Sequence, residues 1–299
     1  VRHGQLLGLL LLWCAGRVAI SSTLPFWLVA TIEGSFLPAL AISLAIPLLK
    51  TRNVRNFIFL FILTALFVCD MSFLFLQTRT PLYVALGMIV LMVSLIGGRV
   101  IPAFTVASLR RRGFQVTQRN QTTLDGLAVF SLILLFASIA IFGIPSFMTA
   151  GAAFTSATIH LLRMRHYHTK LARLDPMIWI LHAGFAWVIL GLFMTGLAAL
   201  DIVPFSIALH AITTGALGSM TLGMMCRVTL GHTGRDISAS RLTTLSFATM
   251  QIASLLRVFA PLTMPESYVL LIIVSGILWA SCFAAYLSIY APLLFKKTA

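Results

Sequence analysis

The segment PMIWILHAGFAWVILGLFMTGLAAL, residues 176–200, contains no Asp, Glu, Lys or Arg and begins directly after Asp175. A helix of this length is long enough to cross the roughly 30 Å hydrocarbon core of a bilayer. The whole chain has the same character, because 60% of its 299 residues are hydrophobic and only 9% are charged. A soluble domain carries roughly 25% charged residues, so lipid must be the solvent for most of this chain.

Similar apolar runs extend outward from this segment in both directions, and each is bounded by charge, Pro or Gly. The runs lie at about 4–20, 25–49, 56–76, 81–107, 123–142, 146–167, 176–200, 204–227, 241–260 and 267–294. The predicted fold class is therefore all-α, a polytopic transmembrane helical bundle of about ten spans. We expect a single domain over residues 1–299, since no soluble domain interrupts the runs.

The net charge of +14 is distributed as short basic clusters between the spans. All Lys and Arg residues fall on one side of the predicted bundle except Arg17, Arg79 and Arg257 on the other side and Arg99 within a span. Basic loops face the cytoplasm in membrane proteins, so both termini are predicted to be cytoplasmic. Because this rule accounts for the clusters, nucleic acid is not expected as a partner, whereas the lipid bilayer is.

The four cysteines occur singly, in or near apolar runs, and no pair of them has metal-ligand spacing. They fit small buried hydrophobic residues. The connecting loops are short, which excludes a soluble catalytic module. Any chemistry must therefore take place inside the bundle or at its edges.

Polar side chains inside a span are costly and are candidates for function. His160 and His182 lie in spans on either side of the basic loop at 163–175, each roughly 10 Å below the same membrane edge. Two imidazoles at one depth could ligate haem iron or copper. The alternative is two separate histidines that are hydrogen-bonded to neighbouring helices.

His210 lies in the opposite half of the bundle, in a span rich in small residues. Gly215, Ser219 and Gly223 follow it at intervals of four, which favours close helix packing in a membrane. The same helix carries soft donors that suit cuprous copper, although a sulfur-rich core is the simpler interpretation. These donors are Met220, Met224, Met225 and Cys226.

Further charged residues fall within the predicted spans. Glu33 and Asp70 lie in the same half as Arg17, so an ion pair with Arg17 is expected, and a proton path is the alternative. Arg99 precedes the helix-breaking Pro102. It could bind a haem propionate or extend to the inner headgroups.

Four motifs stand out among these segments. They are GGRVIP at 97–102, Leu181-His182, Leu209-His210-Ala211 with Gly215, and MMCRVTLGHTGR at 224–235. Together they resemble the NnrS family of bacterial inner-membrane proteins, and the GHTGR string at 231–235 is the most specific of them. The resemblance runs through the whole chain, from Trp13 and Arg17 to Tyr290 and Pro292.

The resemblance implies a multi-pass protein of the bacterial inner membrane that contains haem and copper and takes part in the response to nitric oxide. It leaves open whether the protein is an enzyme. His182 and His210 match family motif positions, His160 and Arg99 would join them at a cofactor, and His232 would be a further metal ligand. Family members also carry a leading region with two more spans and a His-rich motif. We expect this chain to lack that region, since it begins at Val1 without Met.

His182 and His210 are predicted to lie on the order of 10 Å apart in depth, because their spans run in opposite directions. The hypothesis is therefore an inner site at His182, with His160 as partner, and an outer site at His210, completed by histidines of the leading region. Two other classes of function stay open. One is an ion-coupled secondary transporter that uses Glu33, Asp70 and His210, and the other is a membrane subunit without chemistry of its own.

Overall fold

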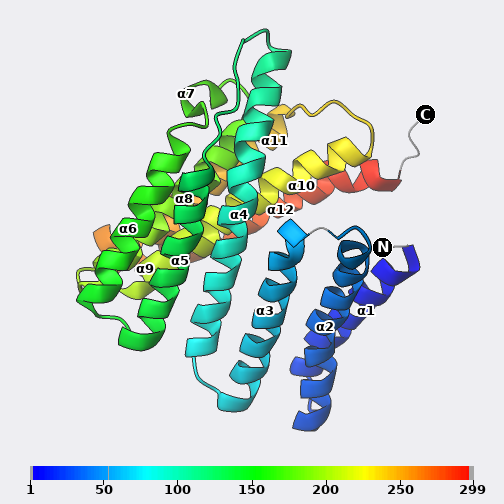
Figure 1. The fold of residues 1–299 in the computed structure, drawn as a ribbon, viewed down its shortest axis with the longest axis vertical. Coiled ribbons are helices and arrows are strands. Elements are labelled where there is room, and N and C mark those ends of the chain that lie inside the picture. Colours follow the sequence, from blue (N-terminus) through cyan, green and yellow to red (C-terminus); the bar gives the residue numbers. More distant parts are fainter. Residues whose placement is uncertain (1–2, 53, 296–299) are drawn as a thin grey trace. The chain divides into compact units, whose positions relative to one another are not determined.

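The computed structural model describes residues 3–52 and 54–295, and every regular element in these ranges is a helix (Figure 1). The predicted all-α fold class is confirmed. The chain divides into two compact units with the boundary between Met92 and Val93, inside the long helix α4 (Thr80–Arg111).

The first unit contains α1 (His3–Ile20), α2 (Phe26–Lys50), the short 3₁₀ helix η1 (Val54–Asn56), α3 (Phe57–Leu76) and the beginning of α4. Helix α2 packs against both α1 and α3. Large side chains on the outside of these helices, such as Trp27, Phe61 and Phe75, are more than half exposed. This unit therefore presents apolar surface where a soluble protein would present charge.

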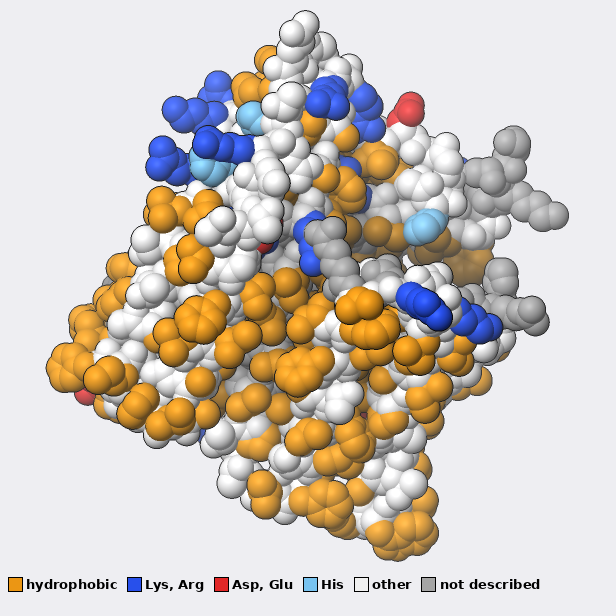
Figure 2. All heavy atoms as spheres, viewed as in Figure 1, with side chains coloured by type: hydrophobic (Ala, Val, Ile, Leu, Met, Phe, Trp, Pro, Cys, Tyr) orange, Lys and Arg blue, Asp and Glu red, His pale blue; other side chains and the backbone are white. Residues whose placement is uncertain are grey.

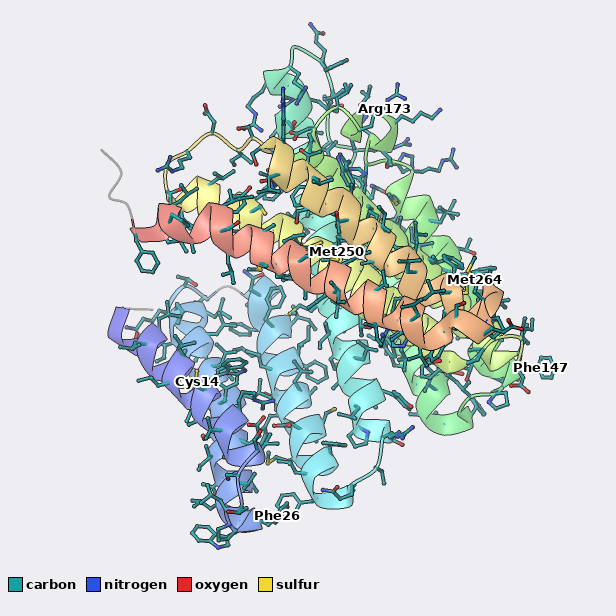
Figure 3. The ribbon with its side chains drawn as sticks, turned by 180° about the vertical axis from the view of Figure 1, so that it is seen from behind. Cys14, Phe26, Phe147, Arg173, Met250 and Met264 are labelled. Atoms are coloured by element: carbon teal, nitrogen blue, oxygen red, sulfur yellow. The ribbon has the colours of Figure 1, made fainter. Side chains whose placement is uncertain are left out.

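The second unit is built around α8 (Pro176–Ala199), which buries side chains around its whole circumference. A helix that buries side chains on all sides has neighbours on all sides, and α8 contacts α6, α9, η2 and α10. The outer pairs are α5 with α6 and α11 with α12. Figure 3 shows α11, with Met250 labelled, lying along α12. The bounds are α5 (Thr122–Phe142), α6 (Phe147–Met164), α7 (Thr169–Ala172), α9 (Phe205–His210), the π-helix η2 (Ala211–Leu217), α10 (Gly218–His232), α11 (Arg241–Thr263), the 3₁₀ helix η3 (Pro265–Ser267) and α12 (Tyr268–Phe295).

Eight helical stretches in the described part of the chain are long and apolar enough to cross a membrane. They correspond to eight of the ten predicted spans, with α9, η2 and α10 forming one continuous stretch at Phe205–His232. The two other predicted spans are also helices. The one at 4–20 is a shorter apolar helix, and the one at 146–167 is α6, which is not among the eight. The polytopic architecture is therefore confirmed, and the side on which each terminus lies stays a prediction.

Lys and Arg side chains gather at one end of the second unit, around α7 and the C-terminal end of α4 (Figure 2). Hydrophobic side chains dominate the rest of the same face. This separation is the pattern of an apolar surface in lipid with a basic rim in contact with the headgroups. We refer to this end as the basic end of the second unit.

Candidate functional site

His160 lies on α6 and is fully buried. Its Nδ1 atom is 2.8 Å from the Ser156 carbonyl oxygen, and its Nε2 atom is 2.8 Å from Ser94 Oγ on α4. A carbonyl only accepts, so Nδ1 carries the proton of the neutral ring and Nε2 accepts from the Ser94 hydroxyl. Both ring nitrogens are thus engaged within the protein.

Arg163, one turn further along α6, completes this network. Its Nε donates to Asp125 Oδ1 at 2.6 Å, and its Nη1 donates to the Ser94 carbonyl oxygen at 2.9 Å. The guanidinium also occupies the place that a Cβ on Gly98 would take. Sequence reasoning assigned Arg163 to a basic loop, but the structure corrects this, since the residue is only 2% exposed. The Gly97-Gly98 pair was the signal that a large group from another helix packs there.

His182 on α8 has the opposite arrangement of protons. Its Nε2 lies 2.9 Å from Thr105 Oγ1, and the Thr105 hydroxyl donates to the Ile101 carbonyl at 2.7 Å. Nε2 must therefore carry the ring proton, while Nδ1 accepts from Thr169 Oγ1 at 3.1 Å. Here too, both ring nitrogens are engaged.

The structure separates the two histidines that were expected at one depth. They bond to Ser94 and Thr105, which are eleven residues apart on α4 and hence about 16 Å apart along its axis. This separation is too large for one metal ion to bind both rings. Equal depths for His160 and His182 would require the chain to leave the bundle at the end of α6. The chain instead stays inside the bundle beyond that end, where Tyr167 is fully buried.

Tyr167 follows α6, and its aromatic ring belongs to a chain of ring contacts that links His182 to His160. Its ring is 6.3 Å from the His182 ring and 5.7 Å from the Phe185 ring, which in turn is 6.0 Å from the His160 ring. The phenol oxygen has no hydrogen-bond partner among the described residues. Burial raises the pKa of this phenol to about 12, so Tyr167 stays neutral at physiological pH.

His210 differs from both histidines above. It ends α9 and is half-buried, and no hydrogen bond to its ring nitrogens is found within residues 3–52 and 54–295. Arg257 on the neighbouring helix α11 acts on it electrostatically. Unlike His160 and His182, His210 therefore has a ring nitrogen whose lone pair is available to a ligand.

The π-helix η2 begins directly after His210. Such segments widen the helix by one residue and are frequent at functional sites. The carbonyl of Thr214 accepts from Ser254 on α11 at 3.3 Å, and the Trp187 ring of α8 lies where a Cβ of Gly215 would be. Gly223 likewise admits Ile180 and Leu181 of α8. The predicted packing role of the small residues is confirmed, whereas the π-helix has no signal that sequence reasoning recognised.

The remaining predicted site residues are dispersed. Arg99 is half-buried on α4 and interacts within the protein, and His232 is exposed at the end of α10. Met220 and Cys226 belong to the buried core of the second unit. Among the residues that the structure describes, no three His, Cys, Asp or Glu side chains come together as a metal site.

The first unit contains the expected ion pair. Arg17 of α1 pairs with Glu33 of α2, whose side chain is only 9% exposed. Both residues line a cavity of about 290 Å³ together with Trp13, Cys69 and Asp70. One guanidinium therefore faces two carboxylates in this cavity.

Comparison with known proteins identifies a family. A family model described as NnrS protein matches residues 1–297. No curated protein and no solved structure matches the chain. The matched range includes every motif residue and every histidine discussed above.

Proposed function

Because the chain belongs to the NnrS family, we propose that it is a multi-pass protein of the bacterial inner membrane that binds haem and takes part in the response to nitric oxide. The observation that carries the proposal is His210, whose ring nitrogens are unbonded among the described residues and which lies at the start of a π-helix. A single imidazole is sufficient to hold haem iron. Haem would supply the iron that binds nitric oxide, and His210 would hold that group.

The residues around His210 fit a haem group in their chemistry. Arg257, on the adjacent helix, would supply a positive charge for a carboxylate of the haem. His160 and His182 fit less well as they stand, because each would have to release a hydrogen bond from Ser94 or from Thr169 to free a ring nitrogen. An inner site at His182 is thus a separate proposal that requires this rearrangement. The same holds for His160 as its partner.

Copper is the less supported part of the family's cofactor set in this chain. A stable copper site takes several soft or imidazole ligands, and no three His, Cys, Asp or Glu side chains come together within the described residues. His232 contributes at most one donor at the protein surface. We therefore propose haem at His210. Metal analysis of the purified protein would show whether it also binds copper.

An optical spectrum of the purified protein after haem supplementation tests this function. We expect a Soret band that shifts on addition of nitric oxide and that is strongly reduced in His210→Ala. His166→Ala is the matched control, since His166 lies in the loop after α6 and outside both histidine networks. If the Soret band were lost in His182→Ala and kept in His210→Ala, the assignment to His210 would be contradicted. Absence of any Soret band in the wild-type protein would contradict haem binding altogether.

An ion-coupled transporter is a second candidate, and the first unit supplies its observation. The cavity lined by Arg17, Glu33 and Asp70 holds one more carboxylate than guanidinium groups. Such a site inside a membrane protein suits proton or cation coupling. Proton-driven solute uptake into proteoliposomes that is abolished by Asp70→Asn, in protein without haem, would favour this function over the first.

A further inference from the structure

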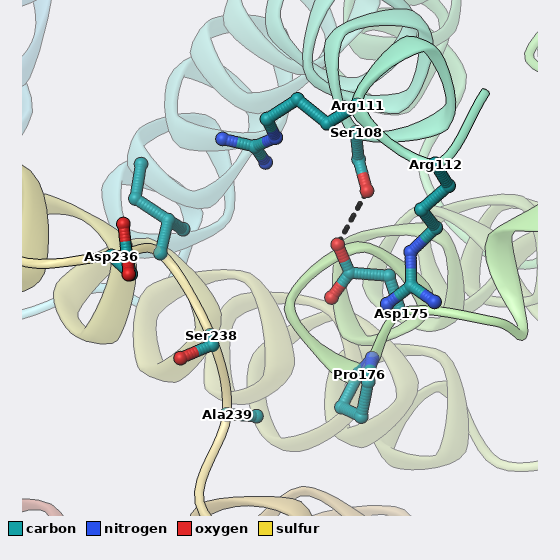
Figure 4. A pocket seen from close by; sticks show the side chains of 9 residues that line it. Ser108, Arg111, Arg112, Asp175, Pro176, Asp236, Ser238 and Ala239 are labelled. Carbon is teal, nitrogen blue, oxygen red and sulfur yellow. Dashed lines mark hydrogen bonds between the residues drawn. The ribbon is translucent and has the colours of Figure 1, made fainter.

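A second cavity opens at the basic end of the second unit, and none of the functions above uses it (Figure 4). Its volume is about 390 Å³, which is room for a group on the order of ten water molecules in size. The floor is formed by the buried residues Ser108 and Asp175. The remaining lining residues are Arg111, Arg112, Pro176, Asp236, Ile237, Ser238 and Ala239.

The cavity lies at the ends of two apolar helices. Helix α4 ends at Arg111, and α8 begins at Pro176, directly after its N-cap residue Asp175. The segment 236–239 follows the GHTGR motif and closes the cavity from the side opposite Asp175 and Arg112 (Figure 4). A group bound here would therefore be at the depth of lipid phosphates.

Two guanidinium groups in this cavity have no assigned partner. Arg111 and Arg112 are exposed, and neither guanidinium makes a hydrogen bond or an ion pair that is found within the described ranges. Their neighbour Arg110 differs, since its Nε donates to the Val116 carbonyl at 2.9 Å. Guanidinium groups with free N–H donors favour phosphate oxygens.

The two carboxylates of the cavity are not equivalent. Asp175 accepts from Ser108 Oγ at 2.5 Å and from the Met177 backbone N–H at 2.9 Å, so each of its oxygens already has a donor. The buried Arg227 also interacts with it electrostatically and offsets its charge. The Asp236 carboxylate lies across the cavity and has no side-chain hydrogen bond within the described residues.

This combination selects a ligand with two charges. Asp236 would weaken the binding of a bare anion, whereas a phosphate that carries an ammonium group satisfies the arginines and Asp236 together. The geometry points to a binding site for a phosphate with a neighbouring ammonium, as in the headgroup of an ethanolamine phospholipid. Arg111 and Arg112 bind the phosphate, and Asp236 accepts from the ammonium. The GHTGR motif thereby gains a role in placing Asp236.

Native mass spectrometry of the detergent-purified protein tests this site with short-chain phosphatidylethanolamine and phosphatidylglycerol as probes. We expect wild-type protein to retain the ethanolamine lipid in preference to the glycerol lipid. Replacement of both arginines, in Arg111→Gln with Arg112→Gln, should weaken retention by about tenfold or more, whereas Arg110→Gln should leave it unchanged. Asp236→Asn should remove the preference between the two lipids and leave the phosphate contacts in place. Equal melting temperatures of the variants serve as the folding control.

Soluble phosphoethanolamine and inorganic phosphate distinguish the source of the ligand. Displacement of the lipid by phosphoethanolamine at equal concentration would assign the site to a soluble compound of the same chemistry. Failure to displace it would assign the site to the membrane. The proposal is overturned if neither lipid nor phosphoethanolamine binds, or if Arg110→Gln weakens binding as much as the double variant. It is also overturned if wild-type protein binds the two lipids equally.

Discussion

Gly98 and Arg163 illustrate how a buried charge is accommodated in the second unit. The guanidinium bonds to Asp125 and Ser94 and fills the space beside Gly98, where any larger residue would displace it. A buried guanidinium that loses its hydrogen-bond partners is costly, even though the Asp125 side chain is partly exposed. The glycine is thus required by a side chain from another helix, and its own backbone conformation is ordinary.

Gly98→Ala is therefore expected to lower the free energy of unfolding by about 2 kcal/mol or more. Gly151→Ala on α6 is the matched control, because a Cβ there meets nothing within 4 Å. Alanine at that exposed helical position should raise stability by about 0.5 kcal/mol. Melting temperatures in detergent measure both changes. A shift of the same sign in the two variants would contradict the role given to Arg163.

Tyr167 gives a second prediction at this scale, because its buried hydroxyl has no partner among the described residues. Tyr167→Phe removes an unsatisfied polar group and should stabilise the protein by about 1 kcal/mol. A clear loss of stability in this variant would show that the hydroxyl does bond within the folded protein.

The same residue predicts a dependence of stability on pH. The pKa of Tyr167 is raised by burial to about 12, whereas an unfolded tyrosine titrates at about 10. The unfolded state therefore releases the tyrosine proton first. The free energy of unfolding keeps its full value below about pH 10 and falls as pH rises toward 12. The advantage of Tyr167→Phe over the wild type should grow across this interval. A constant difference in melting temperature from pH 9 to pH 11.5 would exclude the shift.

At the scale of helices, the π-helix η2 sets the orientation of His210 relative to α10. Deletion of Thr213, an exposed residue within Ala211–Leu217, should restore ordinary α-helical bonding and turn His210 by about 100°. If His210 binds haem, the deletion should strongly reduce the haem content per protein. Thr213→Ala, which keeps the chain length, should leave the haem content unchanged. Equal haem content in both folded variants would show that the π-helix is not needed.

The same elements show how far sequence reasoning reaches. The start of α8 was predictable, since Asp175 accepts from Met177 N–H as an N-cap and Pro176 follows at the first helical position. The pairing of Arg17 with Glu33 followed from two charges in the same half of the membrane. The π-helix was not predicted, because no residue pattern in Ala211–Leu217 marks it, and the packing of Trp187 at Gly215 within it comes from another helix. The separation of His160 from His182 was missed because the chain after α6 stays buried.

At the scale of the whole molecule, the distribution of basic residues predicts which loops face the cytoplasm. Reporter fusions after Lys50, Arg112, Arg173 and Arg235 should report the cytoplasm. Fusions near Arg79, Pro145 and Asp201 should report the periplasm. A cytoplasmic signal at Pro145 would contradict this arrangement, since α5 would then not cross the membrane.

The decisive helix for this topology is α6, which is too polar to count among the eight apolar spans. Its 18 residues are about 27 Å long, close to the hydrocarbon thickness. Its polar residues, including Thr149, Ser156, His160 and Arg163, are buried against the protein, whereas Phe147 is 85% exposed and Leu161 is 58% exposed. Helix α6 can therefore face lipid with its apolar side, because its polar side packs against α5 and α8.

We therefore predict that α6 crosses the membrane, which returns the loop at 163–175 to the same side as Arg112. A single cysteine at Lys170 should then be labelled by an impermeant maleimide only after the cytoplasmic face is opened, like a cysteine at Arg112. A cysteine at Asp201 should be labelled in intact cells. The chain's native cysteines should first be replaced by alanine, since Cys14 is exposed. Labelling of the Lys170 position in intact cells would show that α6 does not cross. The loop at 163–175 would then lie on the side opposite Arg112, which would contradict the cavity that Asp175 and Arg111 line together.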